Sequence, residues 1–357
     1  MKISITKTTA SQLAAVDFQN LPFGKTFSDH MFQATYKDGT WQDARIEPIH
    51  SLSLHPATMS LHYGQAIFEG MKASKGADGR PLLFRPSLHA HRMNASARRL
   101  CMPDIPEDLF LDAVHQLVWL DQAWIPPDAG SALYIRPTMI ATDASIGVRP
   151  SSSYLFFIIT GPVGPYYPKP VRLYAETDYV RAVNGGTGEA KAAGNYAGAL
   201  LPAKMSQDRG FDQVLWLDAK EFRYIQESGT MNIFFVLDGK VITPPLNGSI
   251  LHGITRRSVI ELLRREGHIV EEYAITIDEV LEAHRNGTLQ EAFGTGTAAV
   301  VSQVEAIAYQ DKLIELPPAS QQPIGKFAKK IIDELRAGTI PDPYGWVVPV
   351  SGPEENR

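Results

Sequence analysis

The sequence predicts a mixed α/β fold of two domains. Its 357 residues are more than one hydrophobic core usually organises. Hydrophobic residues make up 44% and charged residues 20%, as in an ordinary globular protein with a large core. Helical and strand patterns are mixed without a regular β-α-β alternation. We therefore expect a smaller N-terminal α/β domain over residues 1–165, a linker over 166–180, and a larger C-terminal domain with mainly antiparallel strands over 181–357.

The first half is predicted to contain strands and a pair of helices. Over residues 30–85, short apolar runs alternate with turn signals such as Lys37-Asp38-Gly39, a pattern typical of antiparallel sheet. Apolar residues then recur at helical spacing, and two further apolar runs have the length of strands. These patterns predict helices over 87–100 and 106–123 and strands over 132–140 and 154–160.

The linker is placed where four prolines and two glycines fall within ten residues, from Gly161 to Pro170. Beyond it, Asp238-Gly239 between apolar runs indicates a tight hairpin, because both residues accept the positive φ angles of such a turn. The remaining patterns predict a strand over 171–176, a helix over 196–206, a strand-rich stretch over 213–242, and helices over 255–266, 277–286 and 324–337.

Composition excludes several classes of function. The net charge of −5 and the scattered basic residues provide no electrostatic surface for nucleic acid or an anionic membrane. No apolar run approaches the ~20 residues that span a bilayer. Cys101 is the only cysteine, which rules out an internal disulfide or a multi-cysteine metal site. The first residues lack the apolar core of a signal peptide. We expect a cytoplasmic protein with no bound metal.

Lys191 is the first candidate for chemistry, since it lies among small residues in the segment 185–196. A thin backbone allows a flat, bulky group to approach the amine closely. A lysine in such a place can form a Schiff base with an aldehyde cofactor. A phosphate-binding P-loop would need Gly-Lys-Ser/Thr, whereas Ala190 and Ala192 flank this lysine. A flexible surface turn with an incidental lysine is the alternative.

A pyridoxal phosphate enzyme also needs an acid for the pyridine nitrogen of its cofactor. Glu227 lies in an apolar strand context, between Tyr224-Ile225 and Ile233-Phe234. A carboxylate buried there requires a cationic partner or several hydrogen bonds. A glutamate on the water-facing side of a strand is the alternative.

Two turns are candidates for binding the cofactor phosphate. Gly253-Ile254-Thr255 opens a predicted helix, whose free N–H groups and positive dipole end suit a phosphate. Phe293 to Ala298 forms a second Gly/Thr-rich turn after an apparent helix. Arg92 on the helix over 87–100 could add a positive charge. Ordinary capping threonines and a surface salt bridge are the structural alternatives.

Tyr134 and Arg136 stand two apart in a predicted strand, so both side chains project from one face. An aromatic ring beside a guanidinium suits a pocket that must hold both apolar and carboxylate groups. A solvated face of a half-buried strand is the alternative.

Taken together, these segments resemble the branched-chain amino acid aminotransferases, which are fold type IV pyridoxal phosphate enzymes. The resemblance covers nearly the whole chain, because motifs over 23–31, 61–72 and 293–298 agree with the family in order and spacing. It implies the fold type IV architecture and pyridoxal 5'-phosphate as cofactor.

The resemblance also assigns roles to individual residues. Lys191 would bind the cofactor aldehyde and carry a proton between the substrate Cα and the cofactor C4′. Tyr196 would bond the ring hydroxyl and Glu227 the pyridine nitrogen. The phosphate ligands would be Arg92, Ile254, Thr255 and Thr297, and the substrate α-carboxylate would be held by Tyr63, Thr230 and the Ala298 amide. Phe23, Phe68, Tyr134, Tyr166 and Met231 would wall the side-chain pocket, with Val148 reaching in from a partner subunit and Arg136 meeting a distal carboxylate.

The implied reaction moves the amino group of L-leucine, L-isoleucine or L-valine to 2-oxoglutarate by a ping-pong mechanism, in a homodimer or an assembly of dimers. A D-amino acid aminotransferase or an aminodeoxychorismate lyase of the same fold is the nearest alternative, and a non-catalytic dimeric protein is a remote one. Animal mitochondrial members carry a Cys-x-x-Cys pair where this chain has Ala299 and Ser302, so redox control through that pair is absent.

Overall fold

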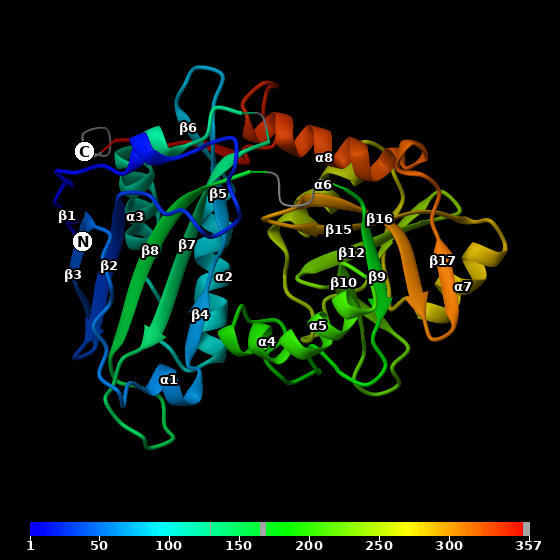
Figure 1. The fold of residues 1–357 in the computed structure, drawn as a ribbon, viewed down its shortest axis with the longest axis horizontal. Helices are drawn as coiled ribbons and strands as arrows, with labels where there is room; N and C mark the ends of the chain where they lie inside the picture. The colour runs from blue at the N-terminus through cyan, green and yellow to red at the C-terminus, as the bar shows by residue number, and fades with distance from the viewer. Residues whose placement is uncertain (129, 165–168, 353–357) are drawn as a thin grey trace. The chain divides into compact units, whose positions relative to one another are not determined.

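The computed structural model describes residues 1–128, 130–164 and 169–352 (Figure 1). The chain forms two compact units. Unit 1 comprises Met1–Tyr166, Ala190–Gly194 and Asp333–Arg357, and unit 2 comprises Tyr167–Glu189 and Asn195–Ile332. This division differs from the expected one, in which the C-terminal domain was the larger. Unit 1 contains more of the chain because the C-terminal strand pairs within its sheet and the segment around Lys191 packs with it.

Unit 1 is built on one sheet, in the order β1-β3-β2-β8-β7-β5-β6-β18, with β4 paired to β7. The strands pair in antiparallel fashion except β1 with β3. Polar turns join neighbours, as at Asp38 and Gly39, which have positive φ angles. The strands are β1 (Ser4–Ile5), β2 (His30–Lys37), β3 (Thr40–Pro48), β4 (Ala66–Phe68), β5 (Met71–Lys75), β6 (Pro81–Phe84), β7 (Ala132–Ala141), β8 (Tyr154–Val163) and β18 (Val347–Pro349).

The helices of unit 1 confirm the helical spacing read from the sequence. They are α1 (Met59–Tyr63), α2 (Pro86–Arg99) and α3 (Glu107–Leu120). The apolar stripe of α3, which includes Leu109, Ala113 and Leu117, is buried with residues of the sheet in one core. The core thereby holds α2 and α3 against the strands that carry the candidate site residues.

Unit 2 contains a closed sheet. β11 pairs with both β10 and β12, so the order β11-β10-β9-β16-β15-β12 returns to its start, and β13, β14 and β17 extend it. Closure leaves no unpaired edge in this ring of strands, and the remaining edges belong to the extensions β14 and β17. Most pairs are antiparallel, as predicted. The strands are β9 (Val171–Ala175), β10 (Gln213–Leu217), β11 (Ile225–Ser228), β12 (Met231–Leu237), β13 (Lys240–Thr243), β14 (Val270–Glu272), β15 (Leu289–Gly296), β16 (Val300–Tyr309) and β17 (Lys312–Glu315).

The Asp238-Gly239 hairpin between β12 and β13 is confirmed, since Leu237 pairs with Lys240 and both turn residues have positive φ. The other helices are α4 (Ala193–Gly198), α5 (Leu200–Asp208), α6 (Ile254–Arg265), α7 (Ile277–Arg285) and α8 (Pro323–Arg336). The expected single helix over 196–206 is wrong. Pro202 has no N–H to donate to the carbonyl of Gly198, so the helix breaks at Ala199. Within the described residues, no helix is both long and apolar enough to cross a membrane.

Candidate active site

The segment that carries Lys191 is held by hydrogen bonds within unit 1. The Lys191 amide donates to Ser96 Oγ on α2 at 2.9 Å, and the Phe68 amide at the end of β4 donates to the Lys191 carbonyl at 3.1 Å. Ala192 forms a β-bridge with Ile67. Because its backbone is fixed between a helix and a strand, the lysine does not lie on a loose surface turn.

The Phe68 ring contacts two basic side chains. Lys191 Nζ is 5.0 Å from the ring centroid and the Arg136 guanidinium carbon is 4.5 Å from it. Arg136 Nη2 donates to Tyr134 Oη at 3.1 Å, and the ring of Phe23 meets that of Tyr134 edge-on at 5.0 Å. The expectation that Tyr134 and Arg136 share one face of β7 is therefore correct, and this face is half-buried.

Arg136 has one buried N–H group that can still donate a hydrogen bond. Its Nε is buried and has no hydrogen-bond partner within the described residues. Arg136 and Tyr134 also line a small cavity of about 30 Å³ together with Thr26 and Phe27, which is room for about one water molecule. A buried guanidinium edge beside aromatic rings can receive a carboxylate once those side chains move slightly.

Gly70 sets the position of Tyr134. A Cβ added at Gly70 would lie 2.1 Å from Tyr134 Oη and 3.0 Å from its Cζ. The rigid phenol must then swing away and lose its bond to Arg136. If Arg136 meets a distal carboxylate, as the resemblance implies, Gly70→Ala should raise the KM for dicarboxylate substrates about tenfold, since repacking of this kind costs about 1–3 kcal/mol. Gly79→Ala, in an open turn of the same unit, is the control for general destabilisation. An unchanged KM for Gly70→Ala would show that the position of Tyr134 does not matter for binding.

Arg92 is buried in an ion-pair cluster, so the surface salt bridge considered above is wrong. Its Nε and Nη2 donate to the two carboxylate oxygens of Glu69 at 2.7 and 2.8 Å, and His89 Nδ1 lies 2.7 Å from Glu69 Oε2. Burial alone would raise the pKa of Glu69, but the charge and hydrogen bonds of Arg92 hold it well below its usual range. Burial lowers the pKa of His89. Arg92 is thus fixed on α2 one turn before Ser96.

Glu227 is buried on β11 in unit 2, and the alternative of a water-facing glutamate is wrong. The residue is 3% exposed. Its Oε1 accepts from the Leu251 amide at 2.9 Å and from Asn232 Nδ2 at 3.1 Å. Its Oε2 lies 2.8 Å from Arg181 Nε. A carboxylate compensated in this way can remain charged in the interior.

The first of the two candidate phosphate turns opens the helix α6 in unit 2. The helix α6 begins at Ile254 after Gly253, and no side chain within the described residues caps it. Ile254 and Thr255 are buried. The N–H groups of the first helical turn have no partner inside the helix, and the helix dipole there favours negative charge.

The second turn differs in part from expectation, because Phe293 to Gly296 belong to β15 and do not follow a helix directly. Thr297 and Ala298 lie in the turn between β15 and β16. Met231, which follows Thr230 in the chain, covers this end of the strand, since a Cβ on Gly294 would lie 2.7 Å from Met231 Cε. The fold therefore brings Thr230 and Met231 to the turn that carries Thr297 and Ala298.

Three other candidates lie on two short helices and in a loop. Tyr196 is on α4, and Tyr63 at the end of α1 donates its hydroxyl to the Ile146 carbonyl. Val148 is 85% exposed in the loop between β7 and β8. Tyr166 lies outside the described residues.

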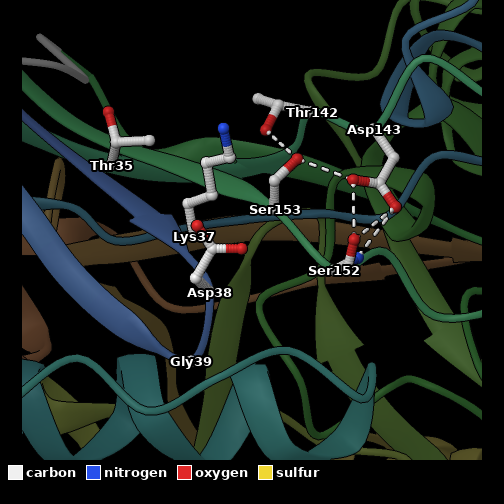
Figure 2. A pocket seen from close by; sticks show the side chains of 8 residues that line it. All are labelled: Thr35, Lys37, Asp38, Gly39, Thr142, Asp143, Ser152 and Ser153. Atoms are coloured by element: carbon white, nitrogen blue, oxygen red, sulfur yellow. Dashed lines mark hydrogen bonds between the residues drawn. The ribbon is translucent and has the colours of Figure 1, made fainter.

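The loop that carries Val148 is held by Asp143. The Asp143 carboxylate accepts hydrogen bonds from Arg149, Ser152 and Ser153, as Figure 2 shows for the two serines. These bonds outweigh the effect of burial and keep the pKa of Asp143 well below its usual range. Asp143, Ser152 and Ser153 also line a depression of about 440 Å³, together with residues at the β2–β3 turn such as Lys37 (Figure 2). None of the candidate site residues lines it.

Sequence reasoning missed several residues that hold the candidates in place. Glu69 and Ser96 anchor Arg92 and Lys191, while Arg181 and Asn232 contact Glu227. One signal was available for Asn232. Gly229-Thr230 is a two-residue turn between strand-like runs, and such a hairpin pairs Glu227 with Asn232.

Comparison with known proteins identifies the family. The family model described as amino-transferase class IV matches residues 66–307. The chain is a class IV aminotransferase. "Branched-chain-amino-acid aminotransferase 2" of Bacillus subtilis (strain 168) is 47% identical to this aminotransferase over 356 residues, which cover 98% of this chain and 97% of the relative. "Branched-chain-amino-acid transaminase 1" of the same organism is 48% identical and covers 94% and 95%.

Solved structures confirm the fold type IV architecture of this aminotransferase. The branched-chain aminotransferase of Thermoproteus uzoniensis, solved with norvaline, has a TM-score of 0.75 and 26% identity, covering 90% of this chain and all of that one. The T.th. branched-chain amino acid aminotransferase, solved with N-(5'-phosphopyridoxyl)-L-glutamate, has a TM-score of 0.73 and 25% identity, covering 89% and 98%. Both neighbours thus share the fold across nearly the whole chain.

Proposed function

We propose that this aminotransferase moves the amino group of L-leucine, L-isoleucine or L-valine to 2-oxoglutarate, with pyridoxal 5'-phosphate as cofactor. The observation that carries the proposal is the Phe68 ring, which contacts the candidate lysine Lys191 and the cation Arg136 within one unit. The names of the relatives favour the branched-chain substrates over a D-amino acid or a lyase reaction.

The residues present fit the cofactor. The uncapped first turn of α6 and the Thr297 turn provide donors for a phosphate. Glu227 provides a buried carboxylate, compensated by Arg181, for a pyridine nitrogen. When bound, pyridoxal phosphate supplies an aldehyde that takes up the amino group and a ring that accepts negative charge from the substrate Cα.

Lys191 is the residue that moves protons in this proposal. Its amine would take the proton from the substrate Cα and pass it on toward the cofactor C4′. Tyr196 would bond the ring hydroxyl, and Arg92, held by its ion pair with Glu69, would serve as a phosphate ligand. Tyr63, Thr230 and the Ala298 amide hold the α-carboxylate. The second half reaction uses the same groups in reverse order.

One pocket must accept both an aliphatic group and a propionate. The proposed apolar wall would stabilise the branched side chain through burial. Among the described residues it comprises Phe23, Phe68, Tyr134 and Met231. Arg136 lies over the Phe68 ring, and its buried Nε can bond a distal carboxylate. The guanidinium is stacked on aromatic rings and is not paired with an acid in the described residues, so an aliphatic substrate would not have to break an ion pair.

Substitution of Arg136 tests this division of roles. We expect Arg136→Met to lower kcat/KM for 2-oxoglutarate by about 10- to 100-fold, because a hydrogen bond to a charged group contributes about 1.5–3 kcal/mol. The values for branched-chain 2-oxo acids should change little. Arg136→Lys keeps the charge but loses the planar guanidinium, so its kcat/KM for 2-oxoglutarate should lie between those of the wild type and Arg136→Met. Equal losses for both kinds of 2-oxo acid would contradict the role assigned to Arg136.

We also propose a cytoplasmic homodimer, or an assembly of dimers, in which Val148 reaches the site of the neighbouring subunit. Its loop is firmly anchored through Asp143, and Val148 is 85% exposed within one chain. A single cysteine fits a reducing compartment.

A steady-state panel of amino donors tests the proposed activity. With 2-oxoglutarate as acceptor, kcat/KM should be high for L-leucine, L-isoleucine and L-valine and very low for D-alanine. A clear preference for D-alanine would overturn the proposal in favour of a D-amino acid aminotransferase.

A further inference from the structure

The side chain of Asn232 connects two parts of the candidate cofactor site in unit 2. Its Nδ2 donates to Glu227 Oε1 at 3.1 Å and to the Leu251 carbonyl at 3.0 Å. The Leu251 amide in turn donates to the same Glu227 oxygen at 2.9 Å. Asn232 is 5% exposed, so these bonds are shielded from water. One amide group therefore ties the acid to the loop that precedes α6.

The oxygen of the Asn232 side-chain amide packs against the residue directly before α6. A Cβ added at Gly253 would lie 1.9 Å from Asn232 Oδ1. Gly253 is the N-cap residue of α6, directly before Ile254 and Thr255. Only a glycine permits this close approach, so the position of the Asn232 side chain and that of the first helical turn depend on each other.

Arg181 provides a second connection between the acid and the same loop. Its Nε lies 2.8 Å from Glu227 Oε2, although the N–H is not aligned for a hydrogen bond. Its Nη2 donates to the carbonyls of Ser249 and Gly188. Both carboxylate oxygens of Glu227 are thus linked to residues 249–255, which we term the phosphate loop.

We propose that Asn232 is a positioning residue that couples the Glu227 carboxylate to the phosphate loop, so that a cofactor's ring and its phosphate bind cooperatively. The proposal rests on the proposed function, in which Glu227 meets the ring nitrogen and the phosphate loop meets the phosphate. A ring that orders Glu227 also orders Leu251 and Gly253 through the Asn232 amide. A phosphate that orders the loop orders Glu227 in the same way, since coupling between two sites is reciprocal.

Separate probes for the two halves of the cofactor test the coupling. The full-length protein, freed of cofactor, is titrated with inorganic phosphate in the absence and presence of saturating pyridoxal, which lacks the phosphate. In the wild type we expect pyridoxal to tighten phosphate binding about 5- to 10-fold. In Asn232→Ala this enhancement should disappear, and each probe alone should bind about tenfold more weakly.

Two further variants keep the test decisive. Asn232→Asp preserves the size of the side chain but removes both amide donors, so it should also abolish the enhancement. This variant replaces Asn232→Ala in the test if the alanine variant does not fold. Thr243→Val is the matched control, because the Thr243 hydroxyl is buried in the same sheet but donates to the Ile233 carbonyl. It should lower the melting temperature while leaving the enhancement intact.

The outcomes separate this inference from the proposed function. Independent binding of phosphate and pyridoxal in the wild type, or an enhancement that survives in both Asn232 variants, would overturn the coupling alone. A wild-type protein that binds neither pyridoxal nor pyridoxal phosphate would overturn the proposed function as well.

Discussion

Replacing Lys191 with alanine is expected to reduce transamination of L-leucine by at least about 10³-fold, because the variant lacks the group that moves the Cα proton. The backbone of Lys191 is held by hydrogen bonds from its amide to Ser96 and from the Phe68 amide to its carbonyl. These bonds do not involve the side chain, which lies beside the Phe68 ring, so its truncation should not disturb the fold. The cofactor should still bind through its phosphate. The measurement is the single-turnover rate with L-leucine at saturating pyridoxal phosphate.

A chemical readout distinguishes loss of the reactive amine from loss of the site. Borohydride reduction should attach the cofactor permanently to the wild type and not to Lys191→Ala. Lys204→Ala is the control, since Lys204 is an exposed lysine on α5 paired with Asp208 at 2.9 Å. Its rate and its labelling should match those of the wild type. Substantial turnover in Lys191→Ala would show that the lysine is misassigned.

Replacing Glu69 with glutamine should destabilise the protein by about 3–5 kcal/mol at neutral pH, the usual cost of removing one partner from a buried ion pair. Glu69 is 0% exposed and compensates Arg92 through two hydrogen bonds. Without the carboxylate charge, Arg92 is left buried and incompletely paired. The measurement is the free energy of unfolding from denaturant titration.

The pH dependence of this effect follows from the depressed pKa of Glu69. Its ordinary value is 4.5 and its value in the folded protein is well below that, so the contribution to stability is fully present above about pH 4.5 and is lost as the pH falls toward the folded value. Between about pH 4.5 and the folded value, the difference in free energy of unfolding between the wild type and Glu69→Gln should shrink by about 1.4 kcal/mol for each unit by which the pH falls. Asp78→Asn, which removes an exposed ion pair with Arg80, should have little effect at any pH. A pH-independent difference for Glu69→Gln would mean that its charge is not what stabilises the cluster.

Local patterns predicted most of the secondary structure. The alternation in β7 correctly placed Tyr134 and Arg136 on one face, and the helical spacing of Leu109 and Leu117 correctly predicted α3. These features depend on side-chain period alone. The break at Ala199 was missed, although Pro202 was visible, because the apolar residues on either side continue at helical spacing.

Long-range pairing explains what the sequence could not reveal. Glu69, directly after β4, and Arg92, on α2, are 23 positions apart in the chain. They meet only because β4 and α2 pack together. Val347 pairs with Phe84 although most of the chain lies between them in sequence, and this pairing places the C-terminal strand in unit 1. Neither contact leaves a periodic signal. Family resemblance identified the candidates for contact with substrate and cofactor, whereas the residues that hold those candidates became visible only as hydrogen-bond partners in the structure.

The most direct test of the central claim is transfer of nitrogen in two separated steps. The protein loaded with pyridoxal phosphate is incubated with L-leucine that carries an isotope label on its amino nitrogen, freed of small molecules, and then mixed with 2-oxoglutarate. We predict labelled glutamate in an amount comparable to that of the protein, because the amino group remains on the enzyme between the two half reactions. If no labelled glutamate forms after the leucine has been removed, this chain is not a ping-pong branched-chain aminotransferase.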